Sequence, residues 1–193
     1  MFLARLLLII PGCALFVAAL GGGSAQAQSI TIDAASAVEA AASSVNMNHT
    51  VGSGSNRFLI VSVAIERDTD RVTAMTYAGQ ALTFVGTSVD PTTTARVEVW
   101  RLIAPATGTN TVSVTFNGLS SVVVAALSFS NVNQTTPIAA SQFATGNATL
   151  TASASVASAT DQVVLATIAA DDAANTVTPG SGQTSRWNVM NAA

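Results

Sequence analysis

The alternation of apolar and polar positions along this chain predicts β-strands. Residues 58–65 form its most apolar run, in which Leu59, Val61, Val63 and Ile65 share one face at a period of two. The opposite face of this run is apolar only at its start. We therefore expect a central strand that is buried on one face throughout and on both faces at its beginning.

Other segments have the same period of two and predict the neighbouring strands. Residues 45–51 alternate most clearly, and residues 121–129 contain a fully apolar stretch that is typical of the middle of a sheet. Beyond residue 131 the chain is less hydrophobic, and its strands are harder to place. The expected strands are residues 30–33, 45–51, 58–65, 72–77, 80–87, 96–103, 111–116, 121–129, 150–156 and 162–170.

Glycine-containing pairs predict the turns between these strands. Gly79 supplies the positive φ of a tight hairpin, and Asn117-Gly118 predicts a second hairpin. Residues 34–42 are rich in alanine but lack the apolar stripe of a packed helix, so we expect them to be irregular. About ten short strands, with turns about 8 to 12 residues apart, predict an all-β antiparallel sandwich of jelly-roll type.

The first 27 residues have the three parts of a secretory signal. Arg5 precedes an apolar run over residues 6–20, and Ala-Gln-Ala at residues 25–27 is a small-x-small cleavage site. The apolar run is shorter than the ~20 residues that span a bilayer, so a retained membrane anchor is the weaker interpretation. We therefore expect cleavage after Ala27, secretion to the cell surface or the extracellular space, and a single domain over residues 28–193.

Cys13, the single cysteine, offers an alternative to simple cleavage. Residues 10–13 resemble a bacterial lipobox, in which the cysteine is lipidated and becomes the first residue. The apolar run continues well past Cys13, which argues against a lipoprotein. If Cys13 is lost with the signal, the exported domain has no disulfide, and its stability depends on packing alone.

Charge is sparse, and this excludes one class of partner. The 193-residue chain has seven basic residues, all of them arginine, and ten acidic residues, which give a net charge of −3 at pH 7. Because nucleic acid needs a basic face, it is excluded as a partner. The surface must consist mostly of neutral polar and small residues, which is typical of extracellular bacterial β-modules.

Four short motifs follow one another along the chain. They are His-Thr-Val-Gly at 49–52, Asn-Arg-Phe-Leu-Ile-Val at 56–61, Thr-Tyr-Ala-Gly-Gln-Ala-Leu-Thr at 76–83 and Val-Trp-Arg-Leu at 99–102. Their order resembles a group of uncharacterised bacterial extracellular β-sandwich modules. The resemblance implies a fold and a location but no activity. Those modules continue with further strands after a Gly-rich loop like residues 179–183, so the resemblance also implies that this chain lacks its last strands and has an open sheet edge that allows self-association.

His49 and Arg57 are candidates for a site, and each also has a structural interpretation. His49 is the only histidine, so any His-based triad or metal site must use it. It shares a strand face with Val45 and Met47, and we therefore interpret it as a buried structural residue whose nitrogens are hydrogen-bonded. Arg57 opens the central strand, where its guanidinium can clamp carbonyls of the preceding turn or a carboxylate such as Glu98; ligand binding is the alternative.

Two further groups of side chains could bind ligands. Trp100 and Tyr77 can stack on a sugar ring, although aromatic residues in sandwiches more often belong to the core. Asp68 and Asp70 lie in a charged loop and carry the oxygen ligands that Ca²⁺ takes, but the EF-hand spacing is absent and a solvated loop is the default interpretation.

The sequence has no nucleophile elbow, phosphate loop or dedicated metal motif. We expect an exported interaction module at the cell surface, with a structural or adhesive role, no catalysis and no cofactor. Its expected partners are other surface proteins or polysaccharide, without membrane contact after cleavage. The alternative is a carbohydrate-binding module that uses Trp100 or Tyr77, with Ca²⁺ held by Asp68 and Asp70.

Overall fold

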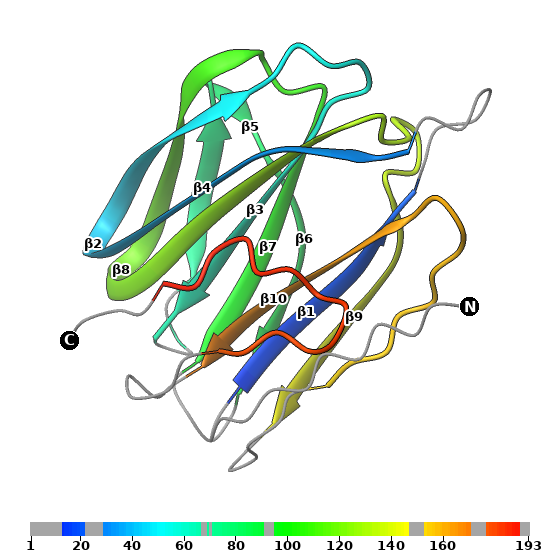
Figure 1. The fold of residues 1–193 in the computed structure, drawn as a ribbon. Coiled ribbons are helices and arrows are strands. Elements are labelled where there is room, and N and C mark those ends of the chain that lie inside the picture. Colours follow the sequence, from blue (N-terminus) through cyan, green and yellow to red (C-terminus); the bar gives the residue numbers. More distant parts are fainter. Residues whose placement is uncertain are drawn as a thin grey trace.

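The computed structural model describes residues 13–21, 29–66, 69, 71–90, 95–146, 153–170 and 177–189. These residues form ten strands, and every strand pair is antiparallel (Figure 1). The described ranges contain no helix, and so none that is long and apolar enough to cross a membrane. The predicted all-β, antiparallel class is confirmed.

A seven-stranded sheet is the larger part of the fold. Its strand order is β5-β4-β8-β3-β7-β6, and β2 pairs with β8 on the side opposite to β3 and β4. The order places β3 between β8 and β7, as the apolar run over residues 58–65 predicted. The strands are β2 (Thr31–Val51), β3 (Phe58–Ile65), β4 (Val72–Tyr77), β5 (Gln80–Ala81), β6 (Thr83–Val89), β7 (Arg96–Ile103) and β8 (Gly108–Ser130).

Strands β2 and β8 are far longer than the sequence predicted, with 21 and 23 residues. The hairpin expected at Asn117-Gly118 is wrong, because β8 runs through these residues and the register shifts opposite them, between Ala42 and Ser44. The irregular segment expected at residues 34–42 is also wrong. Those residues pair with the apolar half of β8, and this pairing outweighs the weak strand preference of alanine.

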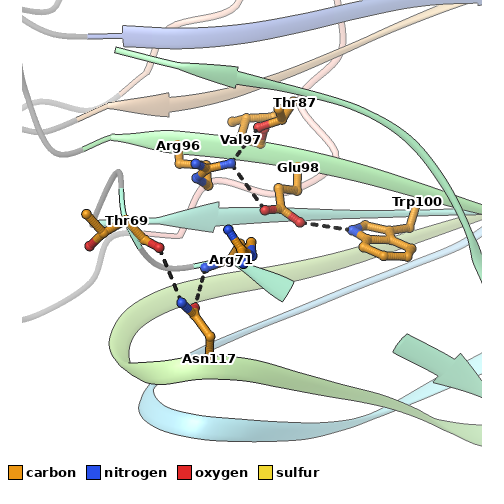
Figure 2. Close-up of polar contacts among 8 residues, drawn as sticks. All are labelled: Thr69, Arg71, Thr87, Arg96, Val97, Glu98, Trp100 and Asn117. Carbon is orange, nitrogen blue, oxygen red and sulfur yellow. Dashed lines mark hydrogen bonds and ion pairs between the residues drawn. The ribbon is translucent and has the colours of Figure 1, made fainter. Parts of the chain in front are cut away.

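Asn117 explains why no turn forms in the middle of β8. Its Oδ1 accepts a hydrogen bond from the backbone N–H of Arg71 at 2.7 Å, and its Nδ2 donates to the carbonyl of Thr69 at 3.3 Å. Its own N–H donates to the Arg71 carbonyl at 3.1 Å. Asn117 therefore ties β8 to the chain before β4, and its polar groups are not used in a hairpin (Figure 2).

The predicted hairpin at Ala78-Gly79 is present between β4 and β5. Tyr77 pairs with Gln80, and the two turn residues have φ values of +50° and +76°. Two successive positive φ values define a tight hairpin turn of the type that glycine favours.

A second, three-stranded sheet has the order β10-β1-β9. Its strands are β1 (Cys13–Leu20), β9 (Ile138–Gly146) and β10 (Val163–Ala170). The sequence predicted β10, but it predicted neither β9 nor a strand within residues 13–20, which belong to the predicted signal. Of the strand expected at residues 150–156, the first three lie outside the described residues and the rest are not in a strand.

Two apolar clusters lie on opposite faces of β3. On one face, Leu59 and Val61 pack against side chains of β2, β4 and β8, because the large sheet curves around this cluster. On the other face, Phe58 and Ile60 pack against the three-stranded sheet. Strand β3 is therefore buried on both faces along nearly its whole length, more than its polar residues predicted.

Candidate functional site

Glu98, in β7, is a carboxylate with only 3% of its surface exposed. Arg96, Glu98 and Trp100 alternate along the strand, so their side chains lie on the same face. Arg96 Nη1 lies 3.4 Å from Glu98 Oε1, and Trp100 Nε1 donates to Glu98 Oε2 at 3.3 Å (Figure 2). Arg96 Nη1 also donates to Thr87 Oγ1 at 3.3 Å, which connects the cluster to β6.

Burial raises the pKa of Glu98 above its ordinary value. The hydrogen bond from Trp100 and the charges of Arg96 and Arg71 lower the pKa in part. The carboxylate thus has partners on its own strand and beside the loop before β4. The hydrogen bond between Trp100 and Glu98 orients the indole of Trp100.

Trp100 has an aromatic neighbour that the sequence analysis missed. Phe84 lies directly opposite Trp100 in the β6–β7 pairing, and the two ring centroids are 5.1 Å apart at 60°. Phe84 is 47% exposed and Trp100 is half-buried. The pair presents aromatic surface to solvent, and Glu98 fixes the orientation of one of the two rings. Only the strand register reveals this pair, because the two residues are 16 positions apart in the sequence.

Tyr77, the other candidate for sugar stacking, has no exposed surface. Its hydroxyl lies within hydrogen-bonding distance of the carbonyls of Gly108 (3.0 Å) and His49 (3.2 Å). The structure therefore does not support a ligand-stacking role for Tyr77. Its ring belongs to the core, and its hydroxyl satisfies backbone groups of β2 and β8.

Arg57, just before β3, donates to backbone carbonyls in two connections of the large sheet. Its Nε donates to the carbonyl of Pro105 at 3.0 Å, and its Nη1 donates to that of Gly54 at 3.1 Å. These bonds connect the turn before β3 to the chain after β7. Arg57 therefore acts as a clamp between two connections, and it is Arg96 that pairs with Glu98.

His49 is 1% exposed and lies edge-on to Tyr77, with ring centroids 6.3 Å apart. Its Nδ1 is 3.0 Å from Ser36 Oγ, whereas its Nε2 is buried and has no partner among the described residues. Burial lowers the pKa of His49, and the charge of Asp33 raises it in part. His49 is therefore held as a neutral ring, with one nitrogen bonded rather than the two that were expected.

Ser36, His49 and Asp33 are the residue types of a hydrolase triad, but they lack its geometry. In a triad the carboxylate holds one imidazole nitrogen and the serine uses the other. Here Asp33 Oδ2 accepts from Gly52 N–H at 2.6 Å and from Ser128 Oγ at 2.9 Å. The group connects the two ends of β2 with β8, and we assign it a structural role.

Asp68 and Asp70, the candidate Ca²⁺ ligands, lie outside the described residues. Among the residues that are described, no three His, Cys, Asp or Glu side chains come together as metal ligands would. The Ca²⁺ site therefore stays a prediction.

A cavity of about 560 Å³ lies between β10, the second half of β8 and residues 177–189. Its walls include Leu127, Phe129 and Leu165, and Trp187 and Arg186 line it from the C-terminal side. Thr167 also lines it, and the buried Oγ1 of this residue has no partner in the described part of the chain. No local pattern in the sequence indicated this cavity, because its walls come from segments far apart in the chain.

Strand β2, one of the edge strands of the large sheet, presents a ladder of neutral polar side chains together with β8. Ser113 Oγ donates to Asn46 Oδ1 at 2.7 Å, Thr111 Oγ1 donates to Asn48 Oδ1 at 3.3 Å, and the Thr50 and Thr109 hydroxyls are 2.7 Å apart. Among the described strands β2 pairs with β8 alone, so its outer edge has no strand partner there.

Comparison of the chain with protein-family models, with curated proteins and with solved structures finds no match.

Proposed function

We propose that this chain is an exported interaction module that acts at the cell surface or outside the cell, with a structural or adhesive role and without catalysis or a cofactor. The open edge of β2 is the observation that carries the proposal. An open edge offers backbone N–H and C=O groups to another strand, and this is a common way for β-proteins to associate.

We further propose that the two sheets form a jelly-roll-like sandwich around the cluster on the Phe58 face of β3.

The edge has few of the features that prevent strand addition. Natural edge strands are usually short, or they carry lysine, proline or bulges. Strand β2 has 21 residues, contains neither lysine nor proline, and carries only Asp33 and Glu39 as acidic side chains. Its register shifts are confined to two places, between Ile32 and Ala34 and between Ala42 and Ser44. Its neutral polar ladder lets another surface protein or a polysaccharide approach without charge repulsion.

Bead aggregation tests the adhesive role. Beads coated with the exported protein should aggregate with one another, because the β2 edges of facing molecules can pair. Lysines at the exposed positions Ala35 and Ala41 should abolish this aggregation. A control variant with lysines at Thr115 and Leu119, which are exposed in the interior strand β8, should aggregate like the unmodified protein.

Two outcomes would count against the adhesive role. Beads that stay dispersed under all conditions would show that molecules of this protein do not bind one another. Aggregation that is equally weakened by both lysine pairs would show that net charge, and not the β2 edge, controls the contact.

A carbohydrate-binding module is the second candidate, and the Phe84–Trp100 pair favours it. Exposed aromatic faces stack on sugar rings, and the hydrogen bond to Glu98 holds the Trp100 ring in place. A glycan array with and without EDTA tests this candidate and its Ca²⁺ requirement. Binding that disappears in Phe84→Ala at an unchanged melting temperature would favour it over the purely adhesive role, since Phe84 is exposed and contributes little to the core.

A further inference from the structure

Strand β1 is part of the fold, but the predicted cleavage after Ala27 would remove it from the exported protein. Strand β1 is the middle strand of the three-stranded sheet, and it lies wholly within the apolar run of the predicted signal. Cleavage after Ala27 would remove β1 and leave β9 and β10 in place. The exported protein would then contain a groove where β1 lies in Figure 1.

The groove has the width of one strand. All eight residues of β1 pair with β10, from Cys13 opposite Ala170 to Leu20 opposite Val163, and the same eight residues pair with β9. Neighbouring strands lie about 4.8 Å apart, so β9 and β10 face each other across about 9.6 Å. That distance is too long for direct hydrogen bonds between them, and it is right for one inserted strand.

The core-facing side of the groove fits apolar side chains of particular sizes. Phe16, Ala18 and Leu20 have no exposed surface and pack into the cluster that contains Phe58 and Val99. The Phe16 ring also lies 4.9 Å from that of Phe143 in β9. An occupant therefore needs a large, a small and a large apolar residue at alternate positions.

The opposite face of the inserted strand is covered as well. Val17 packs against Val164, Ala166 and Ile168 of β10, and the irregular segments at residues 153–162 and 177–189 add Ala154, Val156 and Val177. The groove is thus lined on both faces and along both edges by residues that stay with the exported protein.

Within residues 28–193, no other described strand is free to fill the groove. Every other described strand already pairs in a sheet. The described non-strand segments at residues 153–162 and 177–189 pack over the outer face of β1, through Ala154, Val156 and Val177, and do not lie between β9 and β10.

We propose that the groove between β9 and β10 is a strand-acceptor site in the exported protein, and that its occupant is an extended segment of another polypeptide chain. The segment inserts antiparallel to both β9 and β10, with backbone hydrogen bonds on each side and the large-small-large pattern facing the core. Backbone bonds supply the affinity and the alternate pockets supply the specificity. This inference rests on the proposed export of the chain.

The test uses the exported product of the full-length gene, whose first residue is established by intact mass. A fluorescent peptide with the sequence of residues 13–20, with serine in place of Cys13, is then titrated and followed by anisotropy. We expect a product that begins at Gln28, saturable binding of the peptide and a higher unfolding midpoint of the complex.

A matched peptide with Ala18→Asp should bind at least about tenfold more weakly, because it would bury an unpaired carboxylate in the core. A peptide of residues 31–38, taken from β2, controls for non-specific strand pairing. A product that retains residues 13–20, or equal binding of all three peptides, overturns the proposal. Bead aggregation is measured separately, so peptide binding without adhesion would refute only the adhesive function, and adhesion without peptide binding would refute only the acceptor site.

Discussion

His49 Nδ1 is bonded to Ser36 Oγ, and the rest of the ring fills a closed part of the core beside Tyr77. We expect His49→Ala to lower the free energy of unfolding by about 1–3 kcal/mol, because it removes a buried hydrogen bond and leaves a cavity. Denaturant titration measures this change. Asn48→Ala on the exposed face of the same strand is the control and should change stability by less than about 0.5 kcal/mol. A His49→Ala variant as stable as this control would contradict the structural role.

The raised pKa of Glu98 predicts how the free energy of unfolding depends on pH. Because burial raises its pKa above the ordinary value of 4.5, the fold favours the protonated carboxyl. The stabilisation from the neutral form is complete below pH 4.5 and is lost as pH rises through the folded pKa. Glu98→Gln stays neutral, so its stability relative to the unmodified protein should increase from pH 4 to pH 7.

The measurement for Glu98→Gln is the difference in unfolding free energy between the two proteins at each pH. Because both contain His49, whose lowered pKa reduces stability as pH falls below 6.5, that contribution cancels in the difference. A difference that stays constant with pH would show that the pKa of Glu98 is the same in the folded and unfolded states.

At the scale of elements, Gly86 in β6 controls how closely β9 approaches the large sheet. A Cβ at this position would lie 2.7 Å from Phe143 Cε2, and the Phe143 ring already packs on Phe16. In the full chain we expect Gly86→Ala to reduce stability by about 1–3 kcal/mol through overpacking.

A double-mutant cycle with Phe143→Leu, followed by thermal unfolding, tests the cause. The smaller side chain should relieve most of the clash, so Gly86→Ala should be less destabilising in that background. An equal loss in both backgrounds would mean that the cost arises from the β6 backbone and not from Phe143.

At the scale of the whole molecule, β1 affects the association state. A vacant groove exposes apolar side chains and two unpaired strand edges, so the product of the predicted cleavage should self-associate more strongly than the full chain, in which β1 fills the groove and the β2 edge is the proposed pairing surface. Sedimentation velocity distinguishes the two. The Ala35→Lys and Ala41→Lys pair separates association through β2 from association through the groove, because it affects the β2 edge alone. A monomeric exported product with a sharp unfolding transition would contradict this prediction.

Local patterns in the sequence predicted the features that depend on the period of the backbone. The apolar run over residues 58–65 and the alternation over residues 96–103 located β3 and β7, because successive side chains of a strand point to opposite faces and so leave a local pattern wherever the strand pairs. The same rule placed His49 in the core, since its face also carries Val45 and Met47. Gly79 marked its turn because few other residues adopt a positive φ there at low cost.

Only the tertiary structure decided the features that depend on which strands meet. Residues 34–42 form a strand because β8 supplies their hydrogen-bond partners, and Asn117 avoids a turn because Arg71 and Thr69 bind its side chain. The Phe84–Trp100 pair and the contact between Glu98 and Arg96 depend in the same way on strand register and on burial. Register is set by long-range packing and hydrogen bonding, which no window of neighbouring residues contains. For that reason the chain by itself indicated an antiparallel β-protein, and only the fold showed that residues 13–20, within the predicted signal, form the middle strand of the second sheet.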